Sequence, residues 1–195
     1  QNNLHFVHAK TEISWNQNGN KYGNELDGGS GTGTVSYKIV SEKNLEEKEV
    51  QTGTVATINA ESGEIAIHST GIIEVQATKA GDDCYEEAAA TYKLTINKAV
   101  QKIEFAEENV SLYYGKTDYA QSAKEVEIPE AADGKGVGTG SIAYSIDGEN
   151  PLNAKIDKKT GKVTFVDGKI GTITVKAVKA EDEKYQKCET SYQLQ

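Results

Sequence analysis

The sequence has 195 residues, is 36% hydrophobic and 26% charged, and carries a formal net charge of −9 at pH 7. All of its basic residues are lysines. Because arginine is the usual bidentate ligand of phosphate and guanine, we expect no binding to nucleic acid or to an anionic membrane surface. No run of about 18 apolar residues occurs, so we expect no membrane-spanning segment.

An internal repeat divides the chain into two similar halves. The segment Gly71–Ala80 recurs as Gly171–Ala180, with glycine, aliphatic and lysine residues at matching positions. The similarity extends upstream and downstream of this segment. The offset, which is the difference in residue number between matching positions, changes slightly along the chain. We therefore expect two domains, at 1–98 and 99–195.

Glycine-rich segments occur at Gly28–Gly33 and, in the second copy, at Gly136–Gly140. A phosphate-binding loop of this composition requires a helix N-terminus directly behind it. Here the following residues alternate as in a strand, so a flexible lead-in to a strand is favoured.

The first copy carries an insertion of about nine residues within Val40–Thr54, because the offset between the copies falls from 107 before it to 98 after it. Within the insertion, the charges of Glu42–Glu49 favour a solvated excursion over a helix. We expect a surface loop on a common scaffold.

Apolar and polar residues alternate in the remaining segments, which is typical of half-buried antiparallel strands. Ile58 and Ile65 flank a hairpin turn in which Gly63 occupies a left-handed position. The inward residues expected in the two strands that follow are Ile73, Val75, Ala77, Ala88, Ala90, Tyr92, Leu94 and Ile96. The fold class expected is all-β, with two tandem immunoglobulin-like antiparallel β-sandwich domains.

Four strings recur in both copies. They are G-x-G-x-[VI]-x-Y, A-x-I-[ND]-x-x-[ST]-G-x-[IV], G-x-I-x-V-x-A-x-K-A and D-x-x-Y-x-x-[AC]-x-x-[ST]-Y-x-L. Together they resemble bacterial immunoglobulin-like (Big-type) repeats of surface and adhesin proteins. The resemblance implies a secreted, extracellular or cell-surface module without a cofactor, monomeric, with further repeats in the parent chain.

Acidic residues gather in the loop before the last strand of each copy. In the first copy they are Asp82, Asp83, Glu86 and Glu87, which are the metal-ligand candidates because calcium prefers hard oxygen ligands. The regular spacing of known calcium loops is absent, so a solvated acidic loop is favoured over a calcium site.

Histidine and cysteine offer little further chemistry. His5, His8 and His68 are expected on the surface without metal-binding partners. Cys84 is expected to be exposed and Cys188 buried, and both are expected to be free thiols because equivalent loops of tandem domains lie too far apart for a disulfide. No nucleophile and base recur in both copies, so we expect no catalytic residues and no enzyme.

Aromatic residues allow two interpretations. Tyr37, Tyr85 and Tyr92 recur as Tyr144, Tyr185 and Tyr192, and core packing is favoured for them over a sugar-binding platform. Trp15 corresponds to Tyr114, and both are expected to be core or edge aromatics. The unmatched tyrosines, expected to be free for the surface, are Tyr22, Tyr113 and Tyr119.

Two functions remain open from the sequence. The first is a non-catalytic structural or adhesive module that acts as a semi-rigid stalk or spacer, because the linker Asn97–Gln101 contains neither glycine nor proline. The second is a glycan- or protein-binding module accessory to a surface polysaccharide-processing system, with Val40–Thr54 as its recognition loop. The partner is an unknown protein or glycan in either case.

Overall fold

The computed structural model describes residues 3–128, 131, 133–165 and 169–195. The chain divides into two compact units, unit 1 (Gln1–Ala99 with Ala131–Asp133) and unit 2 (Val100–Glu130 with Gly134–Gln195). Strands form nearly all of the regular structure described, joined by one short 3-10 helix at Gln17–Asn20. The described part of the chain contains no helix long and apolar enough to cross a membrane.

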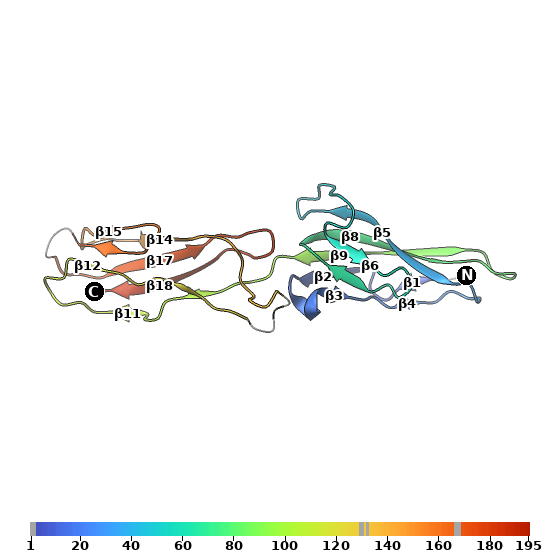
Figure 1. Ribbon diagram of the computed structural model, residues 1–195, viewed down its shortest axis with the longest axis horizontal. Coiled ribbons are helices and arrows are strands. Elements are labelled where there is room, and N and C mark those ends of the chain that lie inside the picture. The colour runs from blue at the N-terminus through green and yellow to red at the C-terminus, as the bar shows by residue number, and fades with distance from the viewer. Residues whose placement is uncertain (1–2, 129–130, 132, 166–168) are drawn as a thin grey trace. The chain divides into compact units, whose positions relative to one another are not determined.

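Unit 1 is built from strands in three hydrogen-bonded groups (Figure 1). The largest sheet has the order β2-β9-β8-β5, the second has the order β3-β7-β6, and β1 pairs with β4. Neighbouring strands are antiparallel except β2 and β9, which run parallel. The strands are β1 (His5–Phe6), β2 (Lys10–Ser14), β3 (Lys21–Tyr22), β4 (Leu26–Asp27), β5 (Val35–Lys43), β6 (Ala56–Ile58), β7 (Ile65–Ile67), β8 (Gly71–Lys79) and β9 (Ala88–Asn97).

Unit 2 has the same topology, strand for strand. Its sheets have the orders β11-β18-β17-β14 and β12-β16-β15, and β10 pairs with β13. The parallel pair is again the one between the second and last strands, β11 and β18. The strands are β10 (Ile103–Glu104), β11 (Asn109–Val110), β12 (Asp118–Tyr119), β13 (Lys124–Glu125), β14 (Ile142–Asp147), β15 (Lys155–Ile156), β16 (Val163–Thr164), β17 (Ile173–Lys179) and β18 (Cys188–Leu194).

The core of each unit follows the expected alternation. Ile73, Val75 and Ala77 on β8 are fully buried, as are their counterparts on β17. On β9, Tyr92 and Leu94 are buried while Lys93 between them is exposed. Each unit is therefore an immunoglobulin-like β-sandwich with a core of its own, as the alternation predicts.

The hairpin turns match the sequence expectation in both units. Gly63 and Gly161 have φ of 72° and 73°, in the left-handed region that favours glycine. Asn59 in unit 1 stabilises its turn because its side-chain oxygen accepts hydrogen bonds from the N–H groups of Glu61 and Ser62.

A cluster of four aromatic rings recurs in the two units. Its members are Phe6, Tyr22, Tyr37 and Tyr92 in unit 1 and Phe105, Tyr119, Tyr144 and Tyr192 in unit 2. Phe6 meets Tyr92 edge-on with ring centroids 4.5 Å apart, and the equivalent pair in unit 2 lies 4.7 Å apart. Tyr22 lies 6.2 Å from Tyr92, and Tyr119 lies 6.2 Å from Tyr192. The expectation that Tyr22 and Tyr119 are unmatched surface residues is therefore wrong. They occupy equivalent, half-buried positions against the two cores, at an offset that changes across the turn at Gln17–Asn20.

Three other expectations are corrected by the structure. Tyr85, expected in the core, is 42% exposed, although its counterpart Tyr185 is buried. Glu42 is not solvated, because only 4% of the residue is exposed. Trp15 is buried as expected, but its counterpart Tyr114 is 79% exposed and belongs to neither the core nor a sheet edge.

Candidate functional site

The acidic loop between β8 and β9 is organised around one carboxylate. One oxygen of Asp82 accepts hydrogen bonds from the backbone N–H and the hydroxyl of Thr32, at 2.7 and 3.3 Å. The other oxygen accepts from the N–H groups of Cys84 and Tyr85, both at 3.0 Å. These donors, with the Thr32 N–H contributing most, hold the pKa of Asp82 below its usual range.

Unit 2 repeats this arrangement at Asp182. Its carboxylate accepts from the N–H and hydroxyl of Thr139, at 2.6 and 3.1 Å, and from the N–H groups of Lys184 and Tyr185, at 2.9 and 2.8 Å. Burial raises the pKa of Asp182, but the hydrogen-bond donors outweigh it and the pKa lies below its usual range. The repeated aspartate thus fastens the loop to the segment that leads into β5 or β14.

The glycine-rich segments are explained by the same contact. An added Cβ at Gly33 would lie 1.8 Å from the carbonyl oxygen of Ala80, and one at Gly140 would lie 2.0 Å from that of Ala180. The two backbones approach too closely for any side chain at these positions. Both segments precede strands, as expected.

The remaining calcium candidates lie apart from this arrangement. Asp83, Glu86 and Glu87 are all exposed. Within the part of the chain that the structure describes, no three His, Cys, Asp or Glu residues gather in a way that could hold a metal ion. Asp82 already directs both of its oxygens at backbone donors, so the calcium site stays a prediction that this geometry does not favour.

The insertion in unit 1 is pinned by the buried Glu42. Its two carboxylate oxygens accept hydrogen bonds from the N–H groups of Gly53 and Val55, the latter at 2.8 Å. Asn44 closes the exposed tip, where its side-chain oxygen accepts from the N–H groups of Glu46 and Lys48. The insertion is therefore a fixed loop rather than a loose excursion.

The histidine residues and Cys84 lie where the sequence suggests, whereas Cys188, expected to be buried, is only partly so. His5, His8 and His68 are exposed, and the His68 ring lies 3.0 Å from the hydroxyl of Thr57. Cys84 is exposed and Cys188 is half-buried, and both are free thiols. Burial raises the pKa of the Cys188 thiol, which makes it a weak nucleophile.

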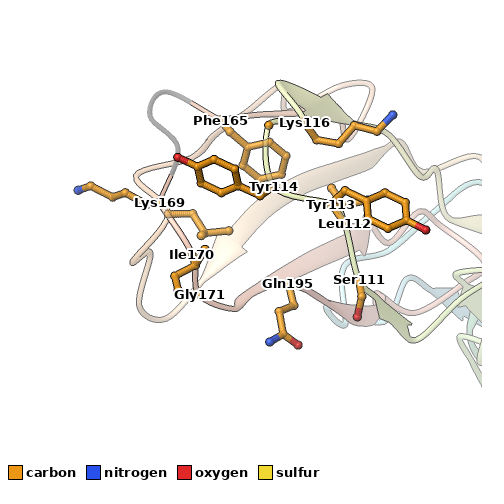
Figure 2. A pocket seen from close by; sticks show the side chains of 12 residues that line it. Ser111, Leu112, Tyr113, Tyr114, Lys116, Phe165, Lys169, Ile170, Gly171 and Gln195 are labelled. Carbon is orange, nitrogen blue, oxygen red and sulfur yellow. The ribbon is translucent and has the colours of Figure 1, made fainter.

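A pocket lies at the end of unit 2 where β18 finishes (Figure 2). It has a volume of about 430 Å³, and its wall mixes polar and apolar side chains from Ser111–Lys116, Phe165, Lys169–Gly171 and Gln195. Figure 2 shows the rings of Tyr113 and Tyr114 on opposite sides of the segment that carries them. No sequence motif marks this site, although the adjacent Tyr113 and Tyr114 stand where the first copy has serine and tryptophan.

No protein-family model matches the chain, and no curated protein matches it. Solved structures that resemble it include human CDH23 EC21-23, with 15% identity and a TM-score of 0.40, covering 97% of this chain and 60% of that chain. Human protocadherin-24 EC1-2 has 10% identity and a TM-score of 0.38, covering 97% and 96%. A SusE-like surface located polysaccharide binding protein from the Bacteroides thetaiotaomicron heparin utilisation locus has 16% identity and a TM-score of 0.33, covering 98% and 33%. The chain spans less than two thirds of the length of the first and third of these.

Proposed function

We propose that the chain is a pair of non-catalytic modules from an extracellular bacterial surface protein of the Big-like type, and that further copies extend it into a semi-rigid stalk. The observation that carries this proposal is the role of the polar residues that recur in both copies. The carboxylates of Asp82 and Asp182 accept hydrogen bonds from backbone N–H groups of their own unit. Lys79 and Lys179 likewise donate to backbone carbonyls, those of Gly29 and Gly140.

A repeated active or binding site would keep a repeated set of polar groups available to a ligand. The recurring aspartate and lysine side chains instead stabilise loops of their own unit. This is expected of a module whose role is structural. The proposal includes the domain boundaries expected from the sequence, with one module at 1–98 and the other at 99–195.

The short linker between the two modules supports the proposal of a semi-rigid stalk. Only Lys98, Ala99 and Val100 lie between the end of β9 and Gln101. The Gln101 side chain is buried in unit 2, where it donates to the carbonyls of Ala180 and Gln186 and accepts from the N–H of Gly138. A connection of three residues leaves little room for motion between modules.

Small-angle X-ray scattering tests the stalk. The native chain should give an extended profile that fits a narrow range of conformations. A matched variant with six Gly-Ser residues inserted between Lys98 and Ala99 should give a clearly broader range. A compact native profile, or one as broad as that of the variant, would contradict the proposal.

The second candidate function is recognition of a glycan or protein through the insertion of unit 1. Its favouring observation is that Glu42 and Asn44 hold the exposed tip in one conformation, since a fixed loop loses less entropy on binding. A glycan array should then show binding that Glu46→Ala and Lys48→Ala abolish. Absence of binding by the native chain would discard this candidate for the glycans tested.

A further inference from the structure

The sheet β3-β7-β6 of unit 1 opens into a fork at one end. β3 pairs with β7 at Lys21 and Tyr22, and beyond Tyr22 the chain continues to β4, which pairs with β1 instead. A pocket of about 420 Å³, which we call the fork pocket, lies between the segment 18–25 and the turn that carries Ser62 and Glu64. Its volume lies within the roughly 300–1,000 Å³ of small-ligand sites.

Polar side chains form the walls of the fork pocket. Asn18, Glu25 and Ser62 are exposed. Within the described part of the chain, the side chains of Asn18 and Glu25 make no hydrogen bond or ion pair. The Lys21 ammonium lies 3.0 Å from one oxygen of Glu64, which leaves further N–H groups and the other carboxylate oxygen available. The pocket therefore offers a ligand both donors and acceptors.

Unit 2 contains an equivalent fork. The Asn24 side chain accepts from the N–H of His8 and donates to its carbonyl, at 3.3 and 2.7 Å. The Gln121 side chain makes the same pair of hydrogen bonds with Glu107, at 2.9 and 3.0 Å. Asn24 and Gln121 therefore occupy the same position, and their neighbours in sequence can be compared directly.

The residues on either side of this position differ between the two forks. Gly23 corresponds to Ala120, and Glu25 corresponds to Ser122. In unit 2 the Ser122 hydroxyl donates to the carbonyl of Thr160 across the fork, at 3.4 Å. In unit 1 an added Cβ at Gly23 would meet no atom within 4 Å. The serine that bridges the fork of unit 2 is thus replaced in unit 1 by a carboxylate without a protein partner.

The turn before β3 also differs, and it carries Asn18 to the pocket. It spans residues 16–20, whereas the equivalent turn of unit 2 spans the shorter segment 115–117. Asn16, Asn18 and Asn20 have φ of 65°, 52° and 59°, in the left-handed region. This conformation costs free energy for residues other than glycine, and such residues cluster at ligand-binding segments.

The composition of the walls favours a neutral polyhydroxyl ligand. Adjacent hydroxyls of a sugar ring donate to carboxylates and accept from amide and ammonium N–H groups. The described lining contains no aliphatic side chain and one aromatic residue, Tyr22, so an apolar ligand would bury little apolar surface. An anionic ligand would face Glu25 and Glu64, and a cationic ligand would face Lys21. A neutral sugar meets neither repulsion.

We propose that the fork pocket of unit 1 binds one neutral hexopyranose unit of a glycan. The Glu25 carboxylate and the Asn18 amide bind neighbouring hydroxyls of the ring, and the Lys21–Glu64 pair binds a further hydroxyl. This site goes beyond the stalk proposed above, and it shares no residue with the insertion Val40–Thr54.

Titration of the ¹⁵N-labelled chain, followed by NMR, tests this assignment. The probes are the methyl glycosides of glucose, galactose, mannose and N-acetylglucosamine. At least one should shift the Asn18 side-chain amide and the Gly23 N–H saturably, with a dissociation constant of about 1 mM, because a few hydrogen bonds at exposed groups give weak binding. The corresponding uronide should bind about fivefold or more weakly, because its carboxylate faces Glu25 and Glu64.

Variants that carry the residues of unit 2 locate the site. Glu25→Ser, alone or combined with Gly23→Ala, should weaken binding by about tenfold or more. The melting curve followed by Trp15 fluorescence should stay unchanged, because the replaced side chain is exposed and makes no contact within the protein. The matched control Glu46→Ala removes an exposed carboxylate from the insertion and should leave binding unchanged.

Absence of a saturable shift with every glycoside at about 50 mM would overturn the proposal. Equal binding by the native chain and Glu25→Ser, or loss of binding in Glu46→Ala, would also overturn it. Stronger binding of Nα-acetyl-lysine amide than of any glycoside would make the pocket a cation site and would contradict the assignment. None of these results depends on the scattering profile, so the sugar site and the stalk can fail separately.

Discussion

The carboxylate of Asp82 accepts hydrogen bonds from two separate segments of unit 1, and the neighbouring Asp83 points its charge into solvent. In Asp82→Asn, an amide N–H₂ takes the place of an oxygen that accepts from Thr32 or from Cys84 and Tyr85. We expect this variant to lower the melting temperature of unit 1 by several degrees, measured by the fluorescence of Trp15. Asp83→Asn removes the same charge without these contacts and should change the melting temperature by less than about 1 °C. Equal losses in the two variants would show that charge, not hydrogen bonding, matters here.

The same residue predicts a dependence on pH. The pKa of Asp82 is lowered in the folded state by the N–H of Thr32 and the other donors. Its contribution to stability is therefore complete above the unfolded value of about 4 and is lost as the pH falls through the folded pKa. The difference in melting temperature between the native chain and Asp82→Asn should be constant from about pH 5 to pH 7 and shrink below about pH 4. A difference that persists unchanged at about pH 2 would contradict this role.

Two buried tyrosine hydroxyls of unit 2 are expected to contribute differently to the free energy of unfolding. The Tyr144 hydroxyl accepts a hydrogen bond from the N–H of Ala123 at 3.0 Å, whereas the Tyr192 hydroxyl is buried without a hydrogen-bond partner among the described residues. Tyr144→Phe should lower the free energy of unfolding of unit 2 by about 1–3 kcal/mol, because it leaves a buried donor unpaired. Tyr192→Phe should leave it unchanged or raise it. Calorimetry compares the two, and a larger loss in Tyr192→Phe would refute the assignment.

At the scale of elements, the insertion of unit 1 depends on Glu42. Removing its carboxylate in Glu42→Ala leaves the N–H groups of Gly53 and Val55 without their acceptor. We expect the free energy of unfolding of unit 1 to fall by about 2 kcal/mol or more, measured by denaturant titration with Trp15 fluorescence. Glu46→Ala, which removes an exposed carboxylate from the same insertion, should have little effect. If the two variants behaved alike, the insertion would not be pinned by Glu42.

The long strands could be predicted from the sequence because their alternation is unbroken. Ile73, Val75 and Ala77 face one way along β8, and the hydrophobic effect alone assigns that face to the core. The hairpin at Gly63 could be predicted because only glycine adopts its backbone conformation without strain.

The roles of Glu42 and Asp82 could not be predicted by the same reasoning. A carboxylate normally prefers water, and only the three-dimensional approach of backbone N–H groups reverses that preference. The sequence did not reveal that Tyr22 and Tyr119 are equivalent, because the turn at Gln17–Asn20 changes the offset between the copies. The pocket beside Tyr114 could not be predicted because its walls come from segments far apart in the sequence, 111–116, Phe165 and 169–171.

At the scale of the whole molecule, the chain builds one kind of sandwich twice, and each copy has its own core. The single tryptophan makes this claim accessible, because Trp15 lies in the core of unit 1 and reports on that unit alone. Val175 lies at the centre of the unit 2 core and Val75 at the same place in unit 1, and both are fully buried. An aspartate at either position would bury an unpaired charge, which a marginally stable unit cannot tolerate.

The most direct measurement is therefore thermal unfolding of Val175→Asp, followed by calorimetry and by Trp15 fluorescence, with Val75→Asp as the reciprocal variant. We expect Val175→Asp to lose the transition of unit 2 while the midpoint reported by Trp15 stays within about 2 °C of that of the native chain. Val75→Asp should abolish the Trp15 transition. Loss of the Trp15 transition in Val175→Asp would show a single core shared by both halves and would contradict the account.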